Sequence, residues 1–321
     1  MVGGGPETKA IFHLTRSPAS LPSFVNDVAE AFGQFVNEQS DAFASTGRAA
    51  YPLVAPEGGK EALLAQLADF SAGSDHQVYT EGSFRIPSIY LNDWPDRYIH
   101  TNFDSPANID PTKLKRAAFI GAASAYFLAN LGPGDVAAIW RTLQGTSLRR
   151  TATMLRRRAA LPPDEAANLT RFHLAYERAL VDSIEDFLPV PAVVRAEAAR
   201  FFEALEQAVG GVAPAAAPTG EGRLVFRRNP EVKGPMAVFG YNYFTDHYGT
   251  ERARGIRLLQ FRGLRSSGGA YAYEVLNFVN GRRTAQEIRD AVSATYGPVP
   301  LALVVEYLRA LAAIGVLHLS P

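Results

Sequence analysis

The sequence predicts an α/β protein, because short apolar segments alternate with helical ones over residues 1–131. Ala10–Thr15 (AIFHLT) and Ile86–Leu91 (IPSIYL) are short, apolar and followed by turn residues, which is typical of strands. Between and after these segments, apolar residues recur at helical spacing. We therefore expect a mostly parallel sheet with helices packed against it.

Three helices are expected in this region. The first begins near Ser20 and carries an apolar stripe that ends at Val36. Leucines at helical spacing predict a second helix over Leu63–Phe70. The third begins at Pro111 and runs to about residue 131, with Asp110 as its N-cap.

The rest of the chain divides by composition. Residues 132–209 show a helical pattern interrupted near Gly145 and at proline pairs, which predicts a helical hairpin or small bundle. Residues 210–222 (GGVAPAAAPTGEG) have the composition of a linker. Residues 223–321 form a last unit, in which Thr284 and Glu287 make a capping box. Its predicted elements are strands Leu224–Phe226, Ile256–Phe261 and Val316–Leu319 and helices Tyr273–Val279, Thr284–Tyr296 and Leu301–Ile314.

Composition and charge exclude several classes of protein. The 321 residues are 47% hydrophobic and 20% charged, which excludes a disordered chain. Their formal net charge is zero, so no global field attracts nucleic acid or a membrane surface, and we expect neither as a partner. The absence of cysteine excludes disulfides and thiolate metal ligands, and the sequence predicts no localisation.

A run of arginines between Val136 and Pro163 contains no acidic residue. An anionic partner would explain this run, but no aromatic residues are interleaved for stacking on single-stranded nucleic acid. We therefore interpret it as a solvated helix face that nearby acids such as Glu177 neutralise.

The loop after the strand Ile86–Leu91 holds the residues best placed for chemistry. In open α/β sheets, ligands bind beyond the carboxyl ends of the strands, so His100 stands where a metal ligand or acid–base group would stand. Asp104 could orient His100 through a hydrogen bond, although a cap on the turn before Pro106 is the favoured interpretation.

The segment "DWPDRYIHTNFDSPANIDPTKLKRAA" resembles the late motif of the co-catalytic zinc aminopeptidases, metallopeptidase family twenty-eight, which includes glutamate carboxypeptidases. Tyr98, His100, Thr101 and Asp104 match its Tyr-His-Thr-x-x-Asp pattern, but Ile99 occupies the position that the family gives to tyrosine. The upstream "GSDH" resembles the pocket loop of the same family. The resemblance covers roughly residues 1–131 and implies the C-terminal half of a three-layer αβα zinc-peptidase sandwich.

The resemblance implies that His100 is a ligand of one of two zinc ions. It places Asp75, His76, Tyr98 and Asp104 in the substrate pocket or next to the metal ligands, although Gly-Ser-Asp is also ordinary turn chemistry. The chain contains no His-x-Asp and no Glu-Glu pair, so the other ligands and the catalytic glutamate have no match. Because "MVGGG" aligns with the residues after a metal-binding aspartate, the resemblance implies that those residues lie upstream of Met1.

We expect a remnant or fragment of a zinc-dependent exopeptidase, whose substrate is a peptide and which is inactive as given. The alternative is a non-catalytic peptide- or protein-binding protein that kept the fold. The last unit resembles the winged-helix-like module of the PqqD type, which implies docking of a peptide or packing within the chain. DNA reading is a poor alternative, because the last helix carries only Arg309 as a basic residue.

Overall fold

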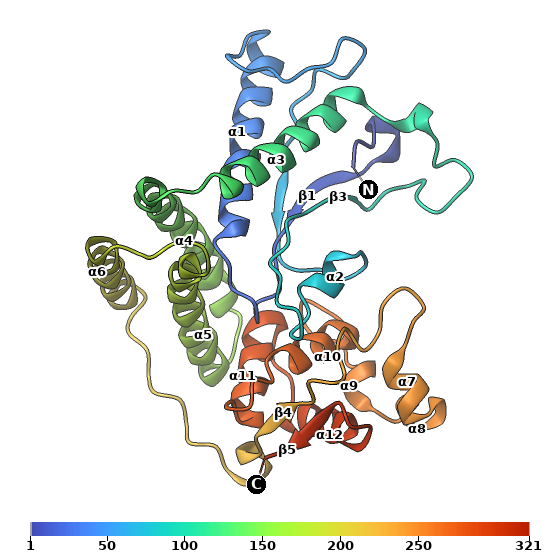
Figure 1. Cartoon of the computed structure of the whole chain (residues 1–321), viewed down its shortest axis with the longest axis vertical. Coiled ribbons are helices and arrows are strands. Elements are labelled where there is room, and N and C mark those ends of the chain that lie inside the picture. The colour runs from blue at the N-terminus through green and yellow to red at the C-terminus, as the bar shows by residue number, and fades with distance from the viewer. Residues whose placement is uncertain (1, 321) are drawn as a thin grey trace.

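The computed structural model describes residues 2–320 and shows an α/β protein with small sheets and many helices (Figure 1). The strands are β1 Ile11–Thr15, β2 Gln66–Ala68, β3 Tyr90–Trp94, β4 Phe226–Arg228 and β5 Leu317–Leu319. The helices are α1 Val25–Thr46, α2 His76–Tyr79, α3 Pro111–Ala129, α4 Val136–Arg158, α5 Pro163–Asp182, α6 Ala192–Ala208, α7 Tyr243–Tyr248, α8 Thr250–Arg254, α9 Arg257–Gln260, α10 Gly268–Asn277, α11 Ala285–Tyr296 and α12 Leu301–Ala313. Short 3-10 helices span Pro6–Thr8, Pro106–Asn108, Pro133–Asp135, Ser183–Asp186 and Gly220–Arg223.

The larger sheet has three strands in the order β2-β1-β3. β1 is parallel to β2 and antiparallel to β3. Thr15 pairs with both Ala68 and Tyr90 at one end of the sheet, whereas Ile11 pairs with Trp94 at the other end. The sheet is therefore mixed, and the expectation of a mostly parallel sheet is wrong. The carboxyl ends of β1 and β2 lie at the end where β3 begins.

Helices α1 and α3 cover one face of this sheet (Figure 1). Phe12 and Leu14 of β1 pack with Val36 of α1 and Ile120 of α3 in one buried cluster. Alternating side chains of a strand point to opposite faces, and Ile11 and Trp94 on the opposite face are 41% and 52% exposed. The described residues thus show helices on one face at this end, and the three-layer sandwich stays a prediction.

Residues 132–209 form the expected helical bundle. Helices α4, α5 and α6 share a buried cluster that includes Trp140, Leu174 and Phe202, and the start of α1 adds Phe24 to it. Gly145 does not interrupt α4, because that helix continues through it to Arg158. The predicted linker has no helix or strand before Gly220 and runs along the molecule between α6 and the last unit (Figure 1).

The last unit has its own core, built from α10, α11, α12 and the short helices before them. β4 and β5 form an antiparallel pair, and the predicted capping box is confirmed, because the Thr284 hydroxyl accepts from the Glu287 amide. The winged-helix likeness stays a prediction. Residues 77–83 contact this unit, since the side-chain Nε2 of Gln77 donates to the Ala237 carbonyl and the buried Glu81 pairs with Arg228.

Two predicted elements are wrong, and a third is displaced, because the strand expected over Ile86–Leu91 is β3, which spans Tyr90–Trp94 and leaves residues 86–89 irregular. Leu63–Phe70 contains the strand β2 between irregular residues instead of a helix, because Asn37 of α1 binds both the amide and the carbonyl of Ala65 and holds the chain extended. Ile256–Phe261 contains α9 instead of a strand. A short apolar run does not distinguish a strand from a buried helical turn, and the fully buried Leu258 belongs to such a turn.

Among residues 2–320, no single helix is long and apolar enough to cross a membrane. Only α11 and α12 taken together meet that criterion, and they are bent by 115° relative to each other.

Candidate functional site

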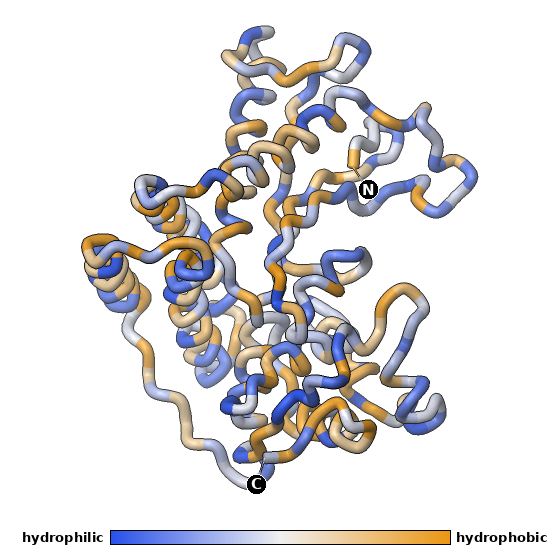
Figure 2. Tube along the Cα trace, viewed as in Figure 1, coloured by the Kyte–Doolittle hydropathy of each residue, from blue (hydrophilic) through white to orange (hydrophobic). Residues whose placement is uncertain are grey.

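His100 lies in the exposed loop that connects β3 to α3. The loop is mostly hydrophilic (Figure 2), and His100 itself is exposed with a left-handed backbone, φ 60°. Its two flanks are anchored to the amino-terminal segment, since the Arg97 amide donates to the Thr8 carbonyl and the Gly5 amide donates to the Asn108 carbonyl. Asp110 caps α3 by accepting from the Thr112 amide at 2.7 Å, as predicted. The His100 loop therefore lies beyond the carboxyl end of β3.

The other residues predicted beside His100 lie in the same loop. The half-buried Tyr98 ring is 6.2 Å from the ring of Phe103, and the Arg97 guanidinium lies 5.4 Å from its centroid. Asp104 is exposed, and its amide donates to the Thr101 carbonyl. The loop thus presents polar groups to solvent at this end of the sheet.

Asp75 and His76 lie outside the His100 loop, at the start of α2. Asp75 is exposed and precedes α2, whereas His76 is buried with its ring stacked 4.0 Å from the ring of Tyr90, the first residue of β3. The Nε2 atom of His76 lies 2.7 Å from the Ser71 carbonyl oxygen. Burial lowers the pKa of His76, so its imidazole stays neutral near pH 7 and acts as a packing group.

The structure does not bring the two predicted motifs together. His76 packs against the start of β3, and the His100 loop follows its end, so the length of the strand separates them. Among residues 2–320, no group of three or more histidine, aspartate or glutamate side chains could hold a metal ion. The described residues do not by themselves form a zinc site, and we derive no chemical step through zinc.

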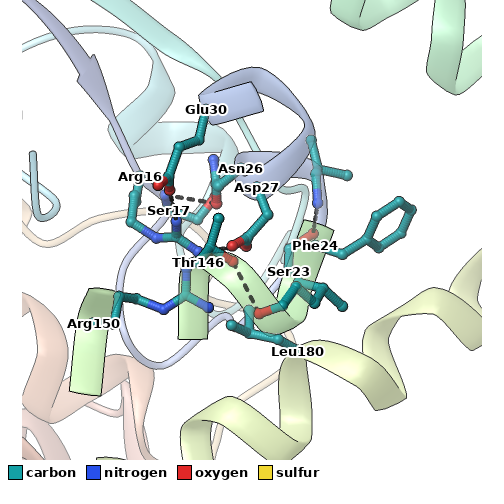
Figure 3. A network of polar contacts seen from close by, with 12 residues as sticks. Arg16, Ser17, Ser23, Phe24, Asn26, Asp27, Glu30, Thr146, Arg150 and Leu180 are labelled. Carbon is teal, nitrogen blue, oxygen red and sulfur yellow. Dashed lines mark hydrogen bonds and ion pairs between the residues drawn. The ribbon is translucent and has the colours of Figure 1, made fainter. Parts of the chain in front are cut away.

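The largest polar cluster lies at the carboxyl ends of β1 and β2. Arg16 directly follows β1, and its guanidinium binds Asp27 at 2.7 Å and Glu30 at 3.1 Å (Figure 3). Arg150 of α4 binds the second oxygen of Asp27 at 2.5 Å. Two further nitrogens of Arg150 bind both oxygens of Glu177 at 2.6 and 2.7 Å.

The electrostatics of this cluster make its charges permanent. Burial opposes ionisation of Asp27, but Arg16 and Arg150 outweigh burial and hold the pKa of Asp27 below its ordinary value. Burial alone would also lower the pKa of Arg16, yet Asp27 together with Tyr176 and Glu30 raises it well above its ordinary value. A carboxylate held ionised in this way accepts hydrogen bonds but does not exchange protons near neutral pH. The cluster is suited to holding structure and not to acid–base catalysis.

A cavity of about 520 Å³ opens beside this cluster. Its walls come from the loop after β1, from β2 and from helices α1, α4, α5 and α11, and they include Arg157, Phe70, Tyr176 and Tyr296. A second, open cavity of about 810 Å³ lies between the segment after β2 and the loops of the last unit around Phe239 and Arg265. The two cavities share Asp69, Phe70, Thr295 and Tyr296, so they are adjacent and meet at these residues.

The sequence interpretation of the arginine run needs correction. Acids do neutralise it, and Glu177 is one of them, but Arg150 is largely buried and pairs with Asp27 from a distant helix. Arg149 and Arg157 pair with Glu30 and Asp69. The run therefore lines a cavity on one side instead of forming a wholly solvated face. The sequence contained one indication of this arrangement: the run has no acidic residue, so any ion pairs of its arginines are formed with acids from other elements.

Comparison of the chain with known protein families, with curated proteins and with solved structures gives no match.

Proposed function

We propose that the protein handles peptides and that residues 1–131 are the C-terminal half of a zinc-dependent exopeptidase-type domain, with His100 as one zinc ligand. The observation that carries this proposal is the local context of the His-Thr-x-x-Asp motif. It lies in a loop between strand β3 and helix α3, and Asp110 caps that helix. That context is what the resemblance requires of the motif. The winged-helix-like unit would serve as the packing partner of residues 77–83.

The proposal makes the chain as printed inactive. One imidazole does not hold a catalytic zinc pair, which needs several protein ligands, and the described residues form no such cluster. Asp75, His76, Tyr98 and Asp104 would then act through the pocket or through the metal ligands, each from the positions described above.

The test is made on the protein isolated from its natural source. We expect about two zinc ions per chain by mass spectrometry and release of the N-terminal residue from unblocked peptides. The variant His100→Asn should lower hydrolysis by more than about 100-fold, because asparagine is a poor zinc ligand but tolerates the left-handed backbone. The control is His318→Asn, which changes an exposed histidine of β5. A zinc-free natural protein without hydrolytic activity would refute the proposal.

The second candidate is a non-catalytic peptide-binding protein. It is favoured by the pair of adjacent cavities, whose combined volume is large enough for an extended peptide and whose lining residues do not include His100. The same purified protein distinguishes the two candidates, because this one predicts peptide binding without zinc and without release of amino acids.

A further inference from the structure

The place where the two cavities meet has an uncompensated positive charge. Arg157 of α4 reaches it from one cavity and Arg265 from the other, and the acid that lines both cavities is Asp69. The Arg157–Asp69 ion pair is 2.6 Å long and partly solvated, with side-chain exposures of 33% and 64%. Such a pair contributes little stability, so a competing carboxylate can displace Asp69 at small cost.

The second guanidinium is fixed in position. Arg265 donates through Nη2 to the carbonyl oxygens of Ala294 and Thr295 at the end of α11. Burial, together with the nearby positive charge of Arg157, lowers the pKa of Arg265. The Asp69 carboxylate opposes this shift, so the two guanidinium groups share one acid, and a second anion between them would reduce their repulsion.

Buried polar atoms without partners point to a missing ligand at this place. Tyr296 lines both cavities, is 5% exposed, and its hydroxyl has no hydrogen-bond partner among residues 2–320. The Nε atom of Arg265 is buried and without a partner in the same part of the chain. Buried donors normally have partners, and leaving one unpaired costs about 1–3 kcal/mol.

The junction of the two cavities lies at the carboxyl ends of the parallel strands, where ligands of α/β sheets bind. β1 and β2 are the parallel pair of the sheet, and Arg16 and Asp69 directly follow their carboxyl ends. Ligands of α/β sheets bind at this end of parallel strands. The His100 loop lies at the other end, because β3 runs antiparallel to β1.

We propose that the junction of the two cavities binds the carboxylate of a peptide, between Arg157 and Arg265 and beside Tyr296, which lines both cavities. The carboxylate is either a free C-terminus or an acidic side chain. The rest of the peptide lies in the larger cavity toward Phe239 and Tyr241, which are 67% and 53% exposed on a tight turn. These aromatic side chains suit an apolar neighbour of the carboxylate.

The inference rests on a peptide ligand, which both candidate functions share, but not on zinc. The probe is a fluorescein-labelled hexapeptide of alanine and phenylalanine, made as the free acid, as the C-terminal amide, and as the amide with aspartate near its end. Fluorescence anisotropy with the full chain should show binding of the free acid or of the aspartate peptide. The plain amide should bind at least about tenfold more weakly, because a charge-assisted pair is lost. The preferred acidic form identifies the source of the carboxylate.

Substitutions of the two residues of the Arg157–Asp69 pair should change peptide affinity in opposite directions. Arg157→Gln should weaken binding about tenfold, whereas Asp69→Asn should strengthen it about threefold, because a competing carboxylate is removed. Tyr296→Phe should weaken binding without lowering the thermal midpoint, since the hydroxyl bonds nothing in the free chain. The matched control is Arg195→Gln, which breaks an exposed ion pair with Glu185 that lines neither cavity.

Three results would overturn the inference. One is equal binding of all peptide forms, which would leave peptide binding intact but remove the carboxylate site. Another is a change of the same sign in Arg157→Gln and Asp69→Asn, which would reduce the pair to a structural contact. The third is no binding of any peptide, which would remove the second candidate function as well.

Discussion

The two ends of the larger sheet differ in construction. At the carboxyl ends of β1 and β2, buried arginines and carboxylates from separate helices form ion pairs beside two adjacent cavities. At the end of β3, the His100 loop is exposed and held mainly by backbone hydrogen bonds at its flanks. One end is held by buried ion pairs between side chains of separate helices, and the other presents an exposed motif whose flanks are held by backbone hydrogen bonds to the amino-terminal segment.

The difference shows that strand direction decides where a sheet places its ligands. The rule that ligands bind beyond carboxyl ends holds for parallel strands. When the rule is applied to β3 alone, it predicts a ligand site in the His100 loop. Because β3 is antiparallel to β1, the rule instead predicts a site at the opposite end of the sheet, where the parallel strands β1 and β2 end. Substitutions at each end of the sheet test this difference between a buried, ion-paired end and an exposed end.

The largest effect is expected at Asp27. Asp27→Asn removes the carboxylate that two buried arginines share, so the free energy of unfolding should fall by about 3–5 kcal/mol. Urea denaturation measures this loss. Glu251→Gln, which breaks an exposed pair with Arg254, should cost little, and equal losses in the two variants would contradict a rigid cluster.

The next effect concerns Glu274 of α10, which ties the last unit to the loop after β1 by accepting hydrogen bonds from the amide and hydroxyl of Ser20. Burial raises the pKa of Glu274 to about 7, although the bonds from Ser20 oppose the shift. In the unfolded chain this glutamate has an ordinary pKa of about 4.5, so between about pH 4.5 and pH 7 the folded state binds more protons and the free energy of unfolding falls as pH rises.

The decrease in the free energy of unfolding that ionisation of Glu274 causes should be on the order of 3 kcal/mol, and it should level off above about pH 7. The glutamine in Glu274→Gln cannot ionise, so this variant should not lose stability in this way. The free energy of unfolding of the variant, relative to that of the native chain, should therefore rise between about pH 5 and pH 8. Urea denaturation of both proteins across this range isolates the contribution. Parallel stability curves would show that Glu274 ionises normally.

A smaller effect is expected at Asp110, the anchor at the carboxyl side of the His100 loop. Asp110→Ala removes the N-cap of α3 and a 3.1 Å hydrogen bond from the Gly59 amide, and should cost about 1–2 kcal/mol. Thermal unfolding checks this value. Asp104→Ala, in the same loop but exposed, serves as the control and should be close to neutral.

The smallest effect is expected at His100 itself. His100→Asn keeps the left-handed backbone and removes an exposed ring, so stability should change by less than about 0.5 kcal/mol. A large loss in urea denaturation would mean that His100 holds the loop, and any loss of zinc or activity would then need another explanation.

Local signals predicted the parts of the fold that local chemistry controls. The strand β1, the helices α1 and α3, the Asp110 cap and the Thr284 capping box all follow from residues near one another in the sequence. The arginine cluster could not be predicted, because Arg150 and Asp27 are 123 residues apart. The segment at Leu63–Phe70 also depends on a distant residue, Asn37, which overrides its helical pattern.

The candidate site divides in the same way. The loop with Tyr98, His100 and Asp104 was found from its own motif, and it lies between a strand and a helix as predicted. The junction at Asp69, Arg265 and Tyr296 combines the N-terminal and C-terminal units, and no local pattern marks it. Sites assembled from distant segments need the fold before they can be recognised.

Hydrogen exchange with and without the free-acid hexapeptide tests the central claim most directly. We expect the peptide to slow exchange of backbone amides around residues 69–71, 265–270 and 294–297 and to leave residues 96–108 unchanged. Protection confined to residues 96–108 would place the peptide at the exposed end beside His100 and would contradict the account.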